Sequence, residues 1–275
     1  MNAKAGRLWI VATPIGNLDD LSTRARATLR DAALIAAEDT RHSAPLLALA
    51  GSRAPAIALH EHNESEQLAR ILDRLRAGDD VALISDAGTP LVSDPGFRLV
   101  RAAREAGFAC SPVPGPCAAI AALSAAGLPS DRFVFEGFLP AKAAARRERM
   151  QELASDPRTL ILYESSHRIV ESLDDAVAAF GAARAAVLAR ELTKLFETII
   201  AAPLAELAAR VRADANQQRG EFVLLIAGAD GEAADAQLAE GRRVFALLRD
   251  ELPPARAAKL AAAITGAPRK QLYEA

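Results

Sequence analysis

The segment Val81-Ala82-Leu83-Ile84-Ser85-Asp86-Ala87-Gly88-Thr89-Pro90 decides the fold class of this chain. Four consecutive apolar residues predict a short buried strand, and the polar run with glycine and proline predicts a turn where the strand ends. Residues 8–12, 33–37 and 56–59 are further strand candidates. Helical patterns over Glu64–Arg76 and from residue 94 to residue 105 lie between them or follow them. Strands that alternate with helices predict an α/β fold with a mostly parallel sheet.

The remaining chain predicts a second α/β segment and a helical tail. Its predicted strands cover residues 132–138, 160–163, 186–189, 198–201 and 221–227. After a linker-like segment at 228–231, only helical patterns follow. We therefore expect an N-terminal subdomain of residues 1–113, a second subdomain of residues 114–228 and a helical module of residues 229–275. Two helices joined by a glycine-containing turn resemble a helix-turn-helix, and a helical hairpin packed on the core is an equally good interpretation.

Composition is that of an ordinary globular protein. Of 275 residues, 51% are hydrophobic and 25% are charged, which is enough apolar material for a sizeable core. The first residues lack the apolar segment of a signal peptide, and no apolar run is long enough to span a membrane. Two cysteines, Cys110 and Cys117, are too few for a disulfide framework. We expect a cytoplasmic protein without a membrane partner.

The net charge of −2 limits the ways in which nucleic acid could be bound. A small protein that holds naked nucleic acid by charge alone is usually basic. An RNA partner would therefore be held by local basic patches, by shape, or as part of a large folded particle.

Ligand-binding fingerprints of the common kinds are missing, and glycine- and proline-containing turns take their place. Neither a G-x-G-x-x-G nor a G-x-x-x-x-G-K-[ST] sequence is present. Turns at residues 13–17, 85–95 and 112–117 follow predicted strands instead. Because the carboxyl ends of parallel strands meet at one edge, these turns are expected to converge and to bind a ligand through backbone groups.

A series of motifs in unbroken order resembles the bacterial small subunit ribosomal RNA methyltransferase I family, within the tetrapyrrole methylase superfamily. The motifs are VATPIGNL (11–18), AEDTR (37–41), HEHNE (60–64), SDAGTPLVSDPG (85–96), PGP (114–116), FEGFLP (135–140), YESSHR (163–168), RELTK (190–194) and GEFV (220–223). This resemblance covers roughly residues 8–228, and the helical tail also resembles the tail of that family.

The resemblance implies a fold, a cofactor and a reaction. The fold would be two α/β subdomains of the tetrapyrrole methylase type, unrelated to the Rossmann methyltransferases, with S-adenosylmethionine in the cleft between them. The protein would be a homodimer that methylates the ribose 2′-oxygen of a cytidine in the decoding region of 16S ribosomal RNA, within the 30S subunit. The implied cofactor contacts are Asp86, Ala87, Gly88, Thr89, Leu91, Val92, Gly115, Pro116, Cys117 and Ala118. Cys117 departs from the family, in which we expect serine there, so a hydroxyl contact to the cofactor is in doubt.

Candidates for catalysis and RNA contact follow from the same resemblance and from the chemistry. A ribose hydroxyl is a very weak acid, so a base or a cation must help as its proton leaves. Glu164, Lys194 and Glu38 are the candidates, although a helix cap or an internal ion pair explains each of them equally well. The expected substrate or RNA contacts are Pro14, Gly16, Asn17, Arg41, Asn63, His167, Arg168 and Arg190.

Two further patterns are ambiguous. A predicted helix with Lys142, Arg146, Arg147 and Arg149 is either a solvated basic face or part of an RNA track. The pair His60 and His62 could bind a metal, but no third ligand is evident, so we expect no metal.

Two other functions compete with rRNA methylation. One is methylation of a small tetrapyrrole, the reaction of distant relatives. The other is a non-catalytic RNA-binding or ribosome-assembly factor that keeps the fold. The AEDTR and HEHNE motifs resemble the RNA branch and disfavour the first alternative, and an intact set of cofactor turns disfavours the second.

Overall fold

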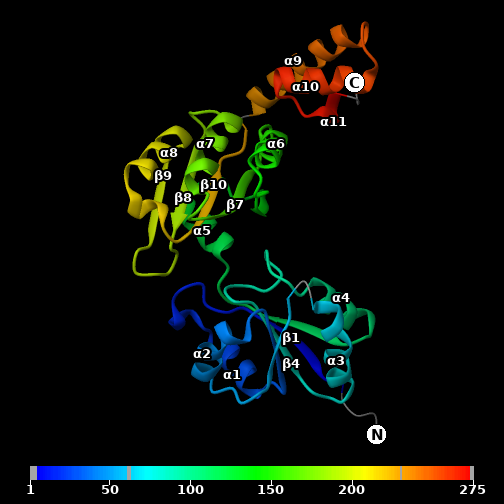
Figure 1. Cartoon of the computed structure of the whole chain (residues 1–275), viewed down its shortest axis with the longest axis vertical. Coiled ribbons are helices and arrows are strands. Elements are labelled where there is room, and N and C mark those ends of the chain that lie inside the picture. Colours follow the sequence, from blue (N-terminus) through cyan, green and yellow to red (C-terminus); the bar gives the residue numbers. More distant parts are fainter. Residues whose placement is uncertain (1–4, 61–62, 230, 273–275) are drawn as a thin grey trace. The chain divides into compact units, whose positions relative to one another are not determined.

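The computed structural model describes residues 5–60, 63–229 and 231–272. The chain forms two compact units, Met1–Ala121 with Leu192–Leu195, and Ala122–Glu191 with Phe196–Ala275 (Figure 1). The boundary predicted after residue 113 thus lies inside the first unit.

The first unit contains a parallel five-stranded sheet. Its strands have the order β3-β2-β4-β1-β5, and every neighbouring pair is parallel. This confirms the α/β fold with a parallel sheet. The strands are β1 (Arg7–Val11), β2 (Leu34–Ala37), β3 (Ala56–Ala58), β4 (Val81–Ile84) and β5 (Ala109–Val113). Strand β5 contains Pro112, which lies at an edge position where a missing N–H is tolerated.

Helices cover both faces of this sheet because alternate residues of each buried strand point to opposite sides. On β2, Ile35 packs into one core and Leu34 into the other. Helices α1 (Thr23–Asp31) and α2 (Thr40–Ala50) supply Leu29 and Leu47 to the first core. Helices α3 (Glu64–Arg76) and α4 (Phe97–Glu105) supply the second (Figure 1). Helix α5 (Ala118–Ala126) follows β5.

The second unit contains a mixed five-stranded sheet of order β6-β7-β10-β8-β9. Strands β6 and β7 are parallel, and the other neighbouring pairs are antiparallel. The strands are β6 (Phe133–Phe138), β7 (Thr159–Ser165), β8 (Ala185–Arg190), β9 (Thr198–Pro203) and β10 (Glu221–Ile226). The helices α6 (Ala143–Leu153), α7 (Ile169–Phe180) and α8 (Leu204–Ala213) pack on one face, where Leu160 and Leu162 of β7 join their core.

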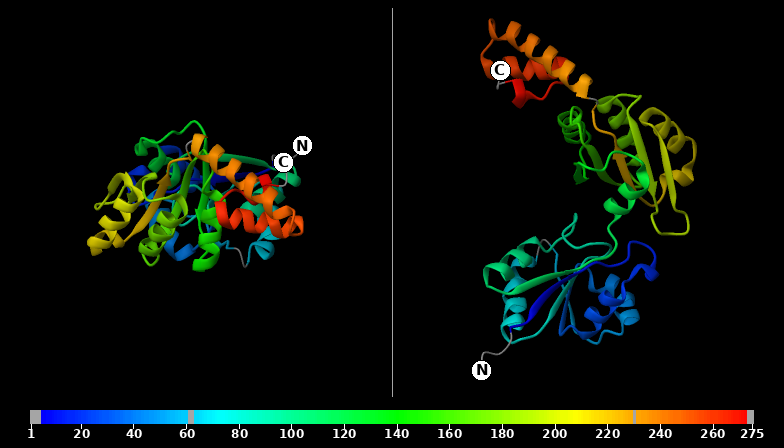
Figure 2. Two further views of the ribbon diagram at one scale, coloured as in Figure 1. Left: turned by 90° about the horizontal axis from the view of Figure 1, so that it is seen from above. Right: turned by 180° about the vertical axis from the view of Figure 1, so that it is seen from behind.

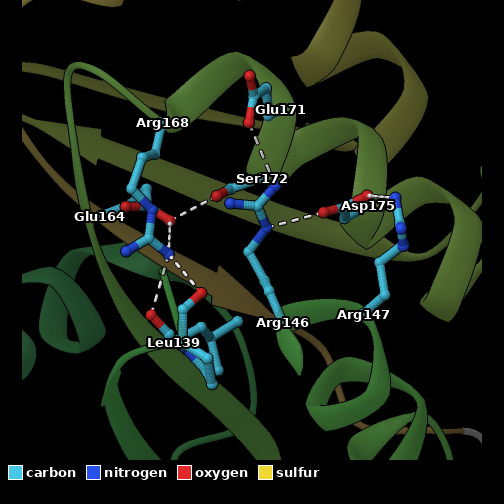
Figure 3. Close-up of polar contacts among 9 residues, drawn as sticks. Leu139, Arg146, Arg147, Glu164, Arg168, Glu171, Ser172 and Asp175 are labelled. Atoms are coloured by element: carbon cyan, nitrogen blue, oxygen red, sulfur yellow. Dashed lines mark hydrogen bonds and ion pairs between the residues drawn. The ribbon is translucent and has the colours of Figure 1, made fainter. Parts of the chain in front are cut away.

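The predicted basic face of α6 contains one buried arginine, Arg146, for which both interpretations are wrong. Arg146 is only 2% exposed, and its Nε donates to Asp175 of α7 at 2.7 Å (Figure 3). Arg149 binds the carboxylate of Glu136 with both Nε and Nη2, at 3.0 and 2.8 Å. Arg146 therefore joins α6 to α7, and Arg149 joins α6 to β6.

The C-terminal residues form three helices with a core of their own. These are α9 (Gly231–Arg249), α10 (Pro254–Thr265) and α11 (Arg269–Leu272), drawn in orange and red in Figure 2. Phe245 of α9 packs with Ala261 of α10 and Leu272 of α11. Gly241 allows this close packing, because a Cβ there would lie 2.4 Å from the Cβ of Ala267.

Across the described part of the chain, every helix is too short or too polar to cross a lipid bilayer.

Removing Asp175 should destabilise the protein severely. Asp175→Ala leaves the buried Arg146 guanidinium without its closest counter-charge, at a cost of about 3–5 kcal/mol in the free energy of unfolding. Glu206→Ala breaks an exposed pair with Arg210 on α8 and should cost less than about 1 kcal/mol. Urea denaturation of both variants measures the difference, and equal losses would contradict a structural role for the buried pair.

Candidate functional site

The turns that follow β4, β1 and β5 are joined because these strands are neighbours in the first sheet. The N–H of Thr13 donates to the carbonyl of Gly88 at 2.8 Å, and the N–H of Gly88 donates to the carbonyl of Thr13 at 3.1 Å. The Thr13 side chain is fully buried, and its Oγ1 lies 3.4 Å from the carbonyl oxygens of Ser85 and Gly88. The β1 turn and the β4 turn are therefore held in a fixed relation.

The β5 turn is tied to the same place. Thr89 Oγ1 donates to the carbonyl of Pro116 at 2.9 Å. Gly115 lies against β1, where a Cβ would approach the Cβ of Ala12 to 3.0 Å. The two segments predicted to hold the cofactor, residues 86–92 and 115–118, are thus brought together at the carboxyl edge of the sheet. Cys117 immediately precedes α5.

Strained backbone is concentrated in the β4 turn. Gly88 has φ +79°, and Leu91 and Ser93 have φ +72° and +67°. Residues with a Cβ seldom adopt such angles, and they persist where the surrounding structure fixes them, often at ligand sites. A Cβ at Gly88 would lie 3.2 Å from Ile15 Cγ2 and 3.7 Å from the carbonyl oxygen of Pro116. Any larger side chain would therefore fill the space between the turns.

Lys194 lies beside the β1 turn. The segment Leu192–Leu195 belongs to the first unit, although it comes from the connection between β8 and β9. A Cβ on Gly16 would be 2.4 Å from Lys194 Cγ and 3.0 Å from Lys194 Cε, so the lysine stem lies directly over this glycine. Asn17 of the same turn accepts from the N–H of Asp19 at 3.1 Å and caps the short helix Leu18–Asp20. Pro14 is buried in this turn.

A group of carboxylates borders the β4 turn. The N–H of Asp86 donates to Glu38 Oε2 at 3.4 Å, and the N–H of Asp39 donates to Asp86 Oδ1 at 3.1 Å. Burial raises the pKa of Asp94 to about 6; a hydrogen bond from Ser85 opposes this shift, and the charges of Glu38 and Asp86 add to it. Glu38, predicted as a catalytic residue, therefore lies next to the predicted cofactor turn.

Sequence reasoning missed Asp94 because it treated Asp94-Pro95 as the start of a helix. Helix α4 begins only at Phe97, and the N–H of Leu99 donates to Glu64 Oε1 at 3.0 Å. Glu64 is 5% exposed and comes from α3, so the cap is supplied by a distant residue. Asp94 is left to face Ser85 and the other carboxylates.

Two other predicted RNA contacts have local structural roles. Asp39 caps α2, and the Arg41 guanidinium lowers the pKa of the Asp39 carboxyl to about 2. The Arg41 side chain is 91% exposed at the start of α2. Asn63 accepts from the N–H of His60 and donates to the carbonyl of Ala58, both at 2.9 Å, and so closes the turn after the edge strand β3.

Glu164 is an anchor for the turn between β7 and α7 (Figure 3). It is 5% exposed, and its Oε1 accepts from the N–H of Ser165 at 2.9 Å. Its Oε2 accepts from Ser172 Oγ at 2.5 Å and pairs with Arg168 at 3.3 Å. Both oxygens are engaged within the second unit, an arrangement that fits structure better than proton transfer.

Of the predicted RNA contacts in the second unit, two arginines bind backbone carbonyl groups and His167 is exposed. Arg168 also donates to the carbonyls of Leu139 and Pro140, at 2.9 and 3.2 Å. Arg190 is 7% exposed and donates to the carbonyls of Arg219 and Phe196, at 2.7 and 3.0 Å, which holds the connection after β8. His167 is exposed on the β7–α7 turn.

Within the residues that the structure describes, no group of three His, Cys, Asp or Glu side chains is arranged to hold a metal ion. Glu61 and His62, part of the ambiguous His60–His62 pattern, lie outside those residues.

Comparison with known proteins agrees with the motifs. Residues 7–208 match the tetrapyrrole (corrin/porphyrin) methylases, and residues 235–275 match the RsmI C-terminal HTH domain. The ribosomal RNA small subunit methyltransferase I of Xylella fastidiosa (strain Temecula1) is 60% identical over 268 residues, 98% of each chain. The protein of the same name from Pseudomonas aeruginosa is 60% identical over 271 residues, 98% of this chain and 96% of that protein. The chain belongs to the ribosomal RNA small subunit methyltransferase I family.

Membership of the small subunit methyltransferase I family confirms the resemblance seen in the sequence, and the fold agrees with it. Uroporphyrin-III C-methyltransferase from Thermus thermophilus, in complex with S-adenosyl homocysteine, superposes with a TM-score of 0.55 at 19% identity. The match covers 81% of this chain and 97% of that chain. At this identity the likeness concerns the fold, which is that of the tetrapyrrole methylases. The HTH match decides between the two interpretations of the tail in favour of the helix-turn-helix.

Asp94→Asn should stabilise the protein in a pH-dependent way. Because the folded-state pKa of Asp94 is raised from 3.8 to about 6, its contribution to stability is present below pH 4 and is lost as the pH rises through 6. The melting temperature of the variant should therefore exceed that of wild type at pH 7.5 and not at pH 4. Scanning calorimetry at both pH values measures this, and a difference that does not change with pH would refute the assignment.

Proposed function

We propose that this chain methylates the ribose 2′-oxygen of a cytidine in the decoding region of 16S ribosomal RNA. As a member of the small subunit methyltransferase I family, it is an S-adenosylmethionine-dependent methyltransferase of small subunit ribosomal RNA. The observation that carries this is 60% identity over 98% of both chains to a protein of that name. The 2′-oxygen, the cytidine and the 30S context rest on the motif resemblance.

The residues at the joined turns fit the cofactor. Gly88 and Gly115 carry no side chain of their own where the β4 and β5 turns meet, which leaves their backbone accessible to a ligand, and Thr89 fixes the spacing of the two turns. We assign the cofactor contacts to Asp86, Ala87, Gly88, Thr89, Leu91, Val92, Gly115, Pro116, Cys117 and Ala118. S-adenosylmethionine supplies a methyl group on a sulfonium, which is already a strong electrophile.

The protein then contributes mainly alignment. Holding oxygen, carbon and sulfur in line accounts for roughly 7–11 kcal/mol at best. Of the three candidate catalytic residues, Lys194 lies over Gly16 and Glu38 lies beside Asp86, both in the first unit. We propose that Lys194 stabilises negative charge on the hydroxyl oxygen as its proton leaves, and that Glu38 is the nearby base. We do not assign a catalytic role to Glu164, because both of its carboxylate oxygens accept hydrogen bonds that hold the β7–α7 turn.

The C-terminal module fits an RNA-docking role through α10 and α11. Residues 254–272 contain no Asp or Glu, while the acidic residues of the described tail lie in and directly after α9. Four exposed cations occupy this stretch: Arg256, Lys259, Arg269 and Lys270. Arg269 reaches the carbonyl of Ala255 at 3.4 Å, which places it next to Arg256. Such a face contacts phosphates and positions RNA without reading its sequence.

In this proposal the enzyme is a cytoplasmic homodimer whose substrate is the assembled 30S subunit. The net charge of −2 supports a particle as substrate, because a short RNA would be held only weakly by charge.

Gly88→Val should abolish binding of S-adenosylmethionine, because the new side chain fills the space between the turns. Gly51→Val is the matched control: Gly51 has φ +75°, close to the +79° of Gly88, but a Cβ there has no atom within 4 Å. Backbone strain is therefore alike in both variants, and only Gly88→Val should lose the heat of binding in isothermal calorimetry. Wild-type affinity in Gly88→Val would refute the cofactor site.

Methyl transfer should require the particle and the α10–α11 cations. Wild-type enzyme should methylate a cytidine 2′-oxygen in 30S particles from cells that lack the enzyme, and should hardly methylate a short oligonucleotide of the same sequence. Changing Arg256, Lys259, Arg269 and Lys270 to Gln should lower the salt-dependence slope of particle binding by about 3 to 4. Cofactor affinity should stay the same. Equal activity on oligonucleotide and particle, or an unchanged salt slope, would contradict this account.

A further inference from the structure

A β-bulge at Glu136 gathers aromatic side chains on one face of the second sheet. Phe135 pairs with Ile161, whereas Gly137 pairs with Leu162 and Phe138 with Tyr163, so Glu136 is the extra residue. In a regular strand, residues three apart point to opposite faces. The bulge removes this alternation, and Phe135 and Phe138 both lie on the side of Tyr163.

These three rings form one cluster at the carboxyl end of β6 and β7. The ring centroids of Phe135 and Tyr163 are 5.0 Å apart at an interplanar angle of 72°, and those of Phe138 and Tyr163 are 5.5 Å apart at 65°. Phe135 and Tyr163 are partly buried, but Phe138 is 56% exposed. The cluster lies opposite the face covered by α6, α7 and α8, since Leu160 and Leu162 of β7 point to those helices.

Two arginine–carboxylate pairs hold this arrangement rigid. Nη2 of Arg149 in α6 donates to both carboxylate oxygens of the bulge residue Glu136, each at 2.8 Å. Arg168 pairs with Glu164 and binds the carbonyls of Leu139 and Pro140, directly after Phe138. The FEGFLP and YESSHR segments are therefore fixed to each other, and their two carboxylates are neutralised.

We infer that Phe138, supported by Tyr163, is a stacking platform for an unstacked base of the RNA substrate. Sequence-specific RNA recognition relies on bases that are splayed out and stacked on aromatic rings. Phe138 offers an exposed ring that its contact with Tyr163 holds in place at the carboxyl end of β6.

The charges around Phe138 favour nucleic acid as the occupant. Glu136 and Glu164 are paired with arginines, while the exposed cation Lys142 follows β6 in the chain. A second copy of this chain bound through an apolar patch would be expected to use the whole exposed strand, including Phe133. Phe133 is 39% exposed on the same face, but at the amino end of β6.

This inference rests on the proposed function, and three substitutions test it. Phe138→Leu keeps an apolar side chain but removes the ring, Phe138→Tyr keeps the ring, and Phe133→Leu is the control on the same strand and face. Affinity for 30S particles from cells that lack the enzyme should fall on the order of 10-fold to 100-fold in Phe138→Leu. It should recover in Phe138→Tyr and stay unchanged in Phe133→Leu. Cofactor affinity and melting temperature should be the same in all three.

The outcomes distinguish a failure of the proposed function from a failure of the stacking platform alone. If wild-type enzyme neither binds nor methylates the particle, the proposed function fails. If wild-type enzyme acts but Phe138→Leu binds the particle normally, the platform alone is refuted. A loss of particle binding accompanied by a lower molar mass in light scattering, in Phe138→Leu or Phe133→Leu, would assign the patch to an interface between copies and would overturn the inference.

Discussion

The pair of backbone hydrogen bonds between Thr13 and Gly88 is the constraint on which the candidate cofactor site depends. It joins the turns of two adjacent parallel strands, and it forms only because Gly88 adopts a positive φ without a Cβ penalty. Thr89 then extends the connection to Pro116 in the β5 turn. Three segments far apart in sequence become one rigid rim, and the polar backbone of this rim is the most specific feature that the first unit offers to a ligand.

A second principle concerns charge. Several arginines that are candidates for RNA contact in the sequence make intramolecular contacts instead: Arg146 with Asp175, Arg149 with Glu136, and Arg190 with two carbonyl groups. A buried guanidinium must be compensated, since an unpaired buried charge is costly. Overall charge and local runs of basic residues therefore say little about which cations meet RNA. The exposed cations of α10 and α11 are better candidates for RNA contact, because residues 254–272 contain no acidic residue that could pair with them.

Local signals predicted much of the fold. Strand β4 and helix α3 have the bounds that periodicity and turn residues indicate, because the signal for each lies within a few neighbouring positions. What escaped prediction depends on contacts between distant segments. Helix α4 begins only at Phe97, where Glu64 of α3 accepts from the N–H of Leu99, and Asp94 lies outside the helix beside Ser85. The bulge at Glu136 is fixed by Arg149 of a later helix, so the strand pattern of residues 132–138 alone could not show that Phe135 and Phe138 share a face. The motifs indicate the turns to which we assign the cofactor, but they could not distinguish Glu164 as an anchor from Glu164 as a base.

Backbone strain outside glycine is confined to two connections of the described chain. The four residues other than glycine with positive φ in the described chain are Leu91, Ser93, Glu191 and Thr193. Each such conformation costs roughly 1–3 kcal/mol, so it persists only where other interactions fix it. Leu91 and Ser93 belong to the turn that contains Gly88, while Glu191 and Thr193 flank the segment that places Lys194 over Gly16. The strain therefore coincides with the two connections to which we assign the cofactor and Lys194. In-line methyl transfer depends on positioning more than on acid–base chemistry, and a rigid, strained rim is the kind of structure that supplies positioning.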